Sequence, residues 1–174
     1  MGKKFVRSIG VLVVMTAIGY LSQGSTSSQA DAAFHKLQAL AGDWQGKDDD
    51  GKAVKSSFVP IASGTGIMET LTMPEMDEMV TLYSKDRDSI VLMHYCPTNN
   101  QPRMRAVPSA EPITELVFSF QGAGNLPDPA VGHEHKLVIR FNDPDHITER
   151  WTWQSKEKDT EMIFHLTRTH SARK

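Results

Sequence analysis

The 174-residue sequence contains a single cysteine, Cys96, so no disulfide within the chain can contribute to its stability. Packing of apolar side chains must provide that stability, and the chain is long enough to bury a substantial core as one domain. Asp and Glu outnumber Lys and Arg by 21 to 19, and no basic stripe is available to contact a phosphate backbone. The composition therefore excludes a disulfide-stabilised fold and argues against a nucleic-acid partner.

Long apolar runs are absent after residue 30, and the one such run stands near the N-terminus. It covers residues 9–21, IGVLVVMTAIGYL, and three basic residues precede it: Lys3, Lys4 and Arg7. This order is typical of a signal peptide, and the run is too short to cross a bilayer comfortably. We therefore expect export to the periplasm or the extracellular space and no membrane span after signal removal. An uncleaved N-terminal anchor is the alternative.

The polar segment after the apolar run ends in small residues that suit a signal peptidase. Ser28 and Ala30 fit cleavage before Asp31, and cleavage before Ala33 is a second option. We predict a signal peptide over residues 1–30. Its removal takes away three positive charges and no negative one, which changes the formal net charge from −2 to −5.

A single domain is expected over residues 31–174, and it begins with a helix. Residues 31–41 predict a short amphipathic helix with Asp31 as its N-cap, and Gly42 ends it. The apolar residues of this segment recur at helical spacing: Phe34, Leu37 and Leu40.

From Asp43 onward, apolar and polar residues alternate, and turn sequences interrupt the alternation. The turns are DDDG (48–51), SGTG (63–66), KDRD (85–88), CPTNNQP (96–102), QGAGNLPDPAVG (121–132) and NDPD (142–145). Alternation with β-branched and aromatic residues indicates strands, and the short connections favour antiparallel pairing. We predict an all-β fold in which about ten strands close into a single up-and-down barrel, because closure removes exposed strand edges.

The junction between the predicted helix and the first strand carries the pattern L-x-G-x-W-x-G, made by Leu40, Gly42, Trp44 and Gly46. This pattern resembles the opening motif of the calycin superfamily, which includes lipocalins, fatty-acid-binding proteins and the ten-stranded nitrobindin-like barrels. We expect Gly42 to permit the tight corner, Trp44 to close one end of the barrel and Gly46 to let two backbones approach. Asp48 stands where nitrobindin-like proteins usually have a third glycine.

Nitrobindin-like proteins bind haem iron through a histidine near the C-terminus, and His165 in MIFHLTR matches it. The resemblance therefore implies an alternative function, a haem b protein that acts on nitric oxide or peroxynitrite with His165 as proximal ligand. In the strand alternation, His165 shares a face with Ile163 and Thr167, opposite Phe164 and Leu166. The sequence leaves open which face lines the barrel.

The stretch HYCPTNNQPRMRA, residues 94–106, spans the end of one predicted strand, a hairpin loop and the start of the next strand. We predict a ligand-contacting set at one mouth of the barrel: His94, Arg103, Tyr95 and Arg105. An arginine in a low-dielectric cavity binds a carboxylate through two parallel hydrogen bonds. The alternative is that both arginines lie in water and the turn residues only satisfy backbone groups.

A catalytic thiol requires a base in contact and a third group that orients the base. Cys96 and His94 are two residues apart on a strand, about 6.6 Å between Cα atoms, and no third member is evident. We assign no catalytic residues and expect a binding protein rather than an enzyme.

The sequence HEH places His133 and His135 on one side of a strand, a spacing that can hold a metal ion with further ligands. The residues that could complete a zinc or copper site are His146 and nearby Asp143 or Asp145. Histidines at a loop edge are more often solvated, so we assign no metal. We assign no cofactor apart from the haem of the alternative function.

These observations predict an exported, lipocalin-like barrel that binds a small, mostly apolar molecule, which could carry a carboxylate. The alternatives are the haem protein and a structural or interaction barrel filled by its own side chains. A homodimer is left open. A continuous cavity of a few hundred Å³ would distinguish ligand binding from a filled barrel.

Overall fold

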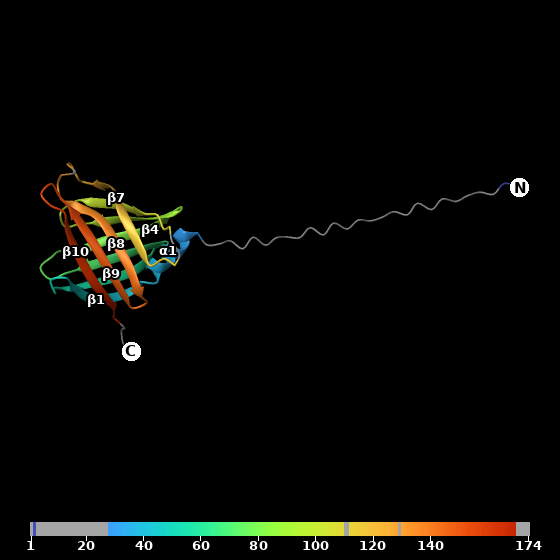
Figure 1. Cartoon of the computed structure of the whole chain (residues 1–174), viewed down its shortest axis with the longest axis horizontal. Coiled ribbons are helices and arrows are strands. Elements are labelled where there is room, and N and C mark those ends of the chain that lie inside the picture. Colours follow the sequence, from blue (N-terminus) through green and yellow to red (C-terminus); the bar gives the residue numbers. More distant parts are fainter. Residues whose placement is uncertain (1, 3–27, 110–111, 129, 170–174) are drawn as a thin grey trace.

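The computed structural model describes residue 2 and residues 28–109, 112–128 and 130–169 (Figure 1). The predicted signal peptide lies outside the described residues, apart from residue 2 and residues 28–30, and stays a prediction. Within the described part, no helix has both the length and the apolar character needed to cross a membrane.

Ten antiparallel strands form one closed barrel, and a single α-helix precedes the first strand. The strands are β1 (Gly42–Asp48), β2 (Ala53–Ile61), β3 (Gly66–Thr72), β4 (Met79–Asp86), β5 (Ser89–Tyr95), β6 (Gln101–Ala106), β7 (Glu115–Gly124), β8 (His133–Asp143), β9 (His146–Gln154) and β10 (Thr160–Arg168), with a 3-10 turn η1 (Ala62–Gly64) between β2 and β3. Each strand pairs with its neighbours in the chain, and β1 also pairs with β10. The predicted all-β, ten-stranded, up-and-down barrel is confirmed.

Helix α1 (Gln29–Gln38) begins and ends earlier than predicted. The hydroxyl of Ser28 accepts a hydrogen bond from the Asp31 backbone N–H at 3.1 Å, and the Asp31 carboxylate accepts one from the Ser28 N–H at 3.1 Å. This reciprocal pair is a capping box, so Ser28 is the N-cap and the prediction of Asp31 was wrong. The predicted domain boundary before residue 31 falls inside α1, where Ala30 is already buried.

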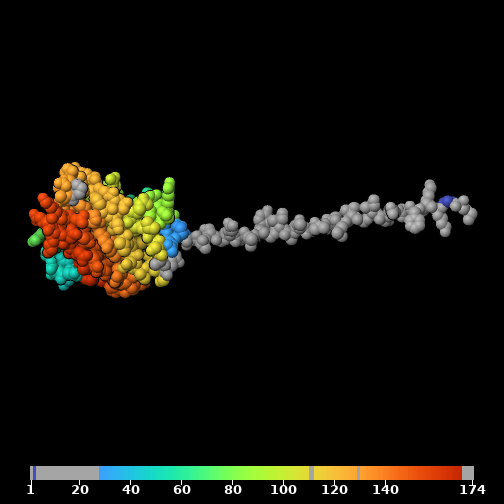
Figure 2. Space-filling view, turned by 45° about the horizontal axis from the view of Figure 1, so that its top comes forward, coloured from blue at the N-terminus to red at the C-terminus, as the bar shows by residue number. Residues whose placement is uncertain are grey.

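Helix α1 lies across one end of the barrel, as Figure 1 and Figure 2 both show. It packs against β4 and β5, and an ion pair joins Asp31 to Lys85 of β4. The face that the helix buries consists of Ala30, Ala33, Phe34 and Leu37. Each large apolar side chain buried in this way contributes about 2 kcal/mol. The helix therefore closes this end of the barrel.

Three residues of the L-x-G-x-W-x-G pattern occupy special positions in the structure. Gly42 adopts a φ of +127°, which other residues rarely adopt. A Cβ on Gly46 would lie 1.7 Å from the backbone oxygen of His165, so only glycine allows β1 and β10 to approach this closely. Trp44 is buried, and its indole N–H donates to the carbonyl of Leu40 at 2.8 Å.

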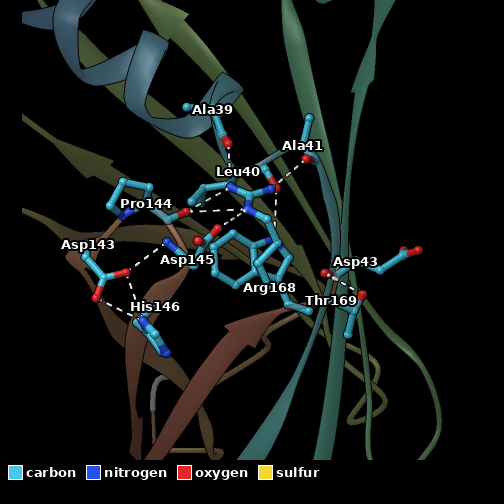
Figure 3. A network of polar contacts seen from close by, with 11 residues as sticks. Ala39, Leu40, Ala41, Asp43, Asp143, Pro144, Asp145, His146, Arg168 and Thr169 are labelled. Carbon is cyan, nitrogen blue, oxygen red and sulfur yellow. Dashed lines mark hydrogen bonds and ion pairs between the residues drawn. The ribbon is translucent and has the colours of Figure 1, made fainter. Parts of the chain in front are cut away.

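Arg168, the last residue of β10, completes the closed end (Figure 3). Its guanidinium donates hydrogen bonds to the carbonyls of Ala39, Ala41 and Pro144, at 2.8, 2.9 and 3.2 Å. The guanidinium carbon also lies 4.3 Å from the ring centre of Trp44. One side chain thus ties the end of α1 to the turn between β8 and β9.

Strand β7 is longer than the turn sequence QGAGNLPDPAVG predicted, because it continues to Gly124. The register of β6 against β7 shifts between Arg103 and Met104, and Gly122 adopts a φ of +138° at this irregularity. A β-bulge absorbs the glycine-rich sequence without ending the strand.

Candidate functional site

A small cavity lies inside the barrel, toward the end opposite α1. Its volume is about 10 Å³, roughly the space that one water molecule needs. The residues that line it come from β3, β4, β5, β8, β9 and β10: Leu71, Met79, Thr81, His94, Glu134, Trp151, Met162 and Phe164. The lining is mostly apolar, with two ionisable groups among it.

His94 enters this cavity from β5 and is buried. Its Nδ1 forms a hydrogen bond with the hydroxyl of Thr81 at 2.9 Å, and its ring centre lies 4.7 Å from that of Trp151. Its Nε2 is buried and has no hydrogen-bond partner. Burial lowers the pKa of His94 to about 4, so the ring is neutral at pH 7.

Glu134 borders the same cavity from β8 and is also buried. Its Oε2 atom has no hydrogen-bond partner. Burial raises the pKa of this carboxyl to about 7. Neighbouring residues of a regular strand point to opposite faces, yet His133 and Glu134 are both buried. The register of β8 against β9 shifts between Glu134 and Lys136, and this bulge explains how Glu134 reaches the cavity.

Two further glutamates lie within the barrel, Glu69 of β3 and Glu149 of β9, and both are buried. Glu69 accepts hydrogen bonds from the hydroxyls of Ser56 at 2.8 Å and Tyr83 at 2.7 Å. The Oε2 of Glu149 accepts one from the Trp151 indole N–H at 3.2 Å. Burial raises the pKa of both carboxyls, and that of Glu149 rises well above its usual range beside Glu69. The Oε1 atom of Glu149 is buried without a hydrogen-bond partner. We infer that Glu149 holds a proton.

These carboxyl groups have no buried cation beside them, since no lysine or arginine of the described residues is buried. Large side chains fill the rest of the interior, with Trp44, Phe58, Tyr83, Phe118 and Phe164 among the largest. The interior is thus densely packed, and its buried carboxyls have no lysine or arginine partner within the described residues.

The structure separates the four residues predicted to contact a ligand. His94 faces the interior, whereas Tyr95 is 43% exposed and points outward. Arg103 and Arg105 pair across the strands with Met93 and Val91, on the outer face of the barrel. His94 and the arginines therefore cannot hold one ligand inside the barrel.

The outer face around the arginines contains an open hollow of about 510 Å³. Arg105 binds Asp86 and the Ser89 hydroxyl there. Arg103 lines the hollow and has no hydrogen bond or ion pair within the described part of the chain. Arg103 is exposed, and Arg105 is held by Asp86 and Ser89.

His165, the predicted haem ligand, lies on the outer face of β10. Its Nε2 is 3.1 Å from a carboxylate oxygen of Asp49, and its side chain is 62% exposed. Phe164 and Leu166 on either side of it are buried in the core. A haem inside the barrel would therefore be out of reach of His165.

The three histidines considered for a metal lie at two ends of the barrel. His133 and His135 are together, with Nε2 of the first 3.1 Å from Nδ1 of the second. His146 lies at the closed end, where its Nδ1 is 2.8 Å from Asp143 (Figure 3). Over the described residues, no group of three or more His, Cys, Asp or Glu side chains converges to hold a metal ion.

The buried glutamates were missed at the level of sequence, although each leaves a signal there. Glu69 alternates with Ile67 and Leu71, and Glu149 alternates with Ile147 and Trp151. An acidic residue on an otherwise apolar strand face indicates a paired or protonated carboxyl in the interior.

Comparison with known proteins gives little further information. No family model matches the chain, and no curated protein matches it either. Among solved structures, that of EF1p2_mFAP2b bound to DFHBI aligns with 82% of this chain and 100% of that chain, at 14% sequence identity and a TM-score of 0.38. A likeness this distant carries no argument about ligand or family. The ten-stranded barrel stands on the structure itself, and membership of the calycin superfamily is not shown.

Proposed function

We propose that the barrel binds a small neutral molecule, with an apolar body and one hydrogen-bonding group, in the cavity beside His94. The observation that carries the proposal is that two buried atoms without partners, His94 Nε2 and Glu134 Oε2, belong to residues that line one mostly apolar cavity. An unsatisfied buried polar atom costs about 1–3 kcal/mol. A ligand that hydrogen bonds both atoms would remove that cost.

The charges inside the barrel favour a neutral ligand over the carboxylate that the sequence suggested. The carboxyls of Glu69 and Glu149 are buried elsewhere in the interior, and the ionisable side chains that line the cavity are Glu134 and the neutral His94. An anion placed there would have no cation to pair with, because Arg103 and Arg105 lie outside.

An organic ligand needs more room than the cavity has in this state. Met79 and Met162 line it, and Met162 near the start of β10 is only partly buried. Methionine is unbranched and adapts its shape readily. Rotation of the Met162 side chain would enlarge the cavity toward the end opposite α1.

The small volume of the cavity favours a second candidate function, an interaction barrel whose interior is filled by its own side chains. The cavity is far below the 300 Å³ or more of ordinary ligand sites. This candidate predicts that no small molecule reaches His94.

Export is also part of the proposal and rests on the sequence alone. The basic residues before the apolar segment 9–21 and the small residues after it support export.

Phenol and benzoate form a matched pair of probes, since both carry one aromatic ring and only benzoate is charged. We expect phenol to shift the ring-nitrogen resonances of His94 in long-range 1H–15N spectra, with saturation, and benzoate to leave them unchanged. Substitution His94→Gln should abolish the thermal stabilisation by phenol, and Arg103→Ala on the outer face should preserve it. Resonances unmoved by either probe would favour the filled barrel.

A further inference from the structure

The bulge in β8 brings two imidazole nitrogens unusually close. Residues two apart on a regular strand have Cα atoms about 6.6 Å apart, and their side chains run parallel. His133 Nε2 and His135 Nδ1 are only 3.1 Å apart. Two nitrogens bound to one tetrahedral Zn²⁺ at about 2.0–2.1 Å lie about 3.3 Å from each other. The nitrogen–nitrogen distance is thus close to that of a chelating pair, and a rotation of the His135 ring would be needed to direct both lone pairs at one ion.

The hydrogen bonds fix which nitrogen of His133 carries a lone pair. Its Nδ1 lies 3.1 Å from the carbonyl oxygen of Val131, which can only accept. Nδ1 of His133 therefore carries the proton and Nε2 a lone pair, the state in which a histidine binds metal with its other N–H held by a backbone carbonyl. His135 Nδ1 then donates to His133 Nε2. If a metal ion takes the place of that proton, the proton moves to Nε2 of His135, and no net proton is released.

The surroundings hold both rings in place. The Phe120 ring centre lies 4.5 Å from that of His133 and 5.1 Å from that of His135. The side-chain amide of Asn100 donates to the carbonyl of Gly132 at 3.0 Å, next to His133 in the chain, and its Oδ1 is buried without a partner. Asn100 is thus anchored to the residue before His133, and its free oxygen is a candidate further ligand.

We propose that His133 and His135 bind a divalent transition-metal ion that prefers imidazole ligands, represented by Zn²⁺, at the end of the barrel opposite α1. Asn100 Oδ1 and water complete the coordination. Because no third His, Cys, Asp or Glu joins the pair within the described residues, the affinity is lower than that of a closed four-ligand zinc site. The site uses atoms other than those of the cavity beside His94, so it does not depend on the proposed function.

Isothermal titration calorimetry of the purified protein with ZnCl₂ tests the proposal. We expect one ion per chain, at least a tenfold loss of affinity in His135→Ala, and no change in His146→Ala, whose histidine lies at the opposite end beside Asp143. Equal affinity in His135→Ala, or no binding by the unmodified protein, would overturn the proposal.

A spectroscopic measurement on the unmodified protein covers the case in which His135→Ala fails to fold. Long-range 1H–15N spectra report which nitrogen of each ring is protonated. We expect Zn²⁺ to move the proton of His135 from Nδ1 to Nε2 while His133 keeps its Nδ1 proton. An unchanged His135 tautomer at saturating Zn²⁺ would mean that the ion binds elsewhere.

Discussion

The guanidinium carbon of Arg168 lies 4.3 Å from the ring centre of Trp44, and this contact joins the last strand of the barrel to the first. The same guanidinium satisfies carbonyl groups at the end of α1, including that of Ala39. The Arg168 side chain is 18% exposed, so these hydrogen bonds are largely shielded from water. One side chain thus contributes both to the closure of the barrel and to the attachment of the helix.

Substitution Arg168→Met should lower the free energy of unfolding by about 2–4 kcal/mol, because it leaves several carbonyls unpaired and removes the contact with Trp44. Denaturant unfolding measures this loss. The control is Arg140→Met, which removes an exposed ion pair with Glu115 and should cost less than about 1 kcal/mol. Equal losses in the two variants would show that Arg168 does not hold the closed end together.

Substitution Glu149→Gln should stabilise the barrel increasingly as the pH rises. Burial raises the pKa of Glu149 above that of the unfolded chain. The contribution of the protonated Glu149 to stability is therefore complete below the pKa that this glutamate has in the unfolded chain. That contribution is lost as the pH rises toward its pKa in the folded protein. A glutamine needs no proton and stays neutral throughout. Each pH unit within this window favours the variant by about 1.4 kcal/mol relative to the native chain.

Unfolding curves at several pH values test this prediction, and Glu69→Gln is the matched control. Ser56 donates to one oxygen of Glu69 and Tyr83 to the other, so the amide nitrogen of a glutamine would replace one of these acceptors and face a donor. We expect Glu69→Gln to destabilise the protein at every pH. Equal behaviour of the two variants would contradict the assignment of the proton to Glu149.

Acid should destabilise the barrel through His94. The pKa of His94 is lowered to about 4 in the folded protein, against 6.5 for an ordinary histidine. The unfolded chain takes up a proton in this interval and the folded chain does not, so stability falls as the pH decreases from about 6.5 to 4, by about 3 kcal/mol in total. The slope of stability against pH should flatten in His94→Gln and persist in His165→Gln, whose ring is exposed.

If the protein is exported as proposed, its mature chain should begin at or before Ser28, and not at Asp31 as the sequence suggested. Cleavage before Asp31 would remove the N-cap of α1, worth about 1 kcal/mol, together with the buried Ala30. Intact-mass measurement of the exported protein locates the cut. A mature chain that begins with Asp31 would show that α1 starts later in the processed protein than in the full chain.

Local patterns in the sequence were sufficient to predict the barrel, because most strands show their own alternation and most turns carry glycine, proline or asparagine. The start of α1 was missed since Ser28 lies in a polar segment that suits a signal peptidase. The face taken by Arg103 depends on the register of β6 against β5, where it pairs with Met93. No single strand reveals that register.

The interior site was predictable only as far as the alternation within single strands reaches. His94 shares its strand face with Ile90 and Leu92, and all three are buried. The meeting of Glu69 with Glu149 joins strands 80 positions apart in the chain, and only the closed barrel brings them together. The cavity beside His94 likewise depends on six strands at once.

A crystal structure of the protein soaked with phenol tests the central claim most directly. We predict phenol in the cavity lined by Leu71 and Trp151, with its hydroxyl within hydrogen-bond distance of His94 Nε2 and the Met162 side chain displaced. An interior that stays closed, with phenol absent or bound only in the outer hollow beside Arg103, would contradict ligand binding inside the barrel.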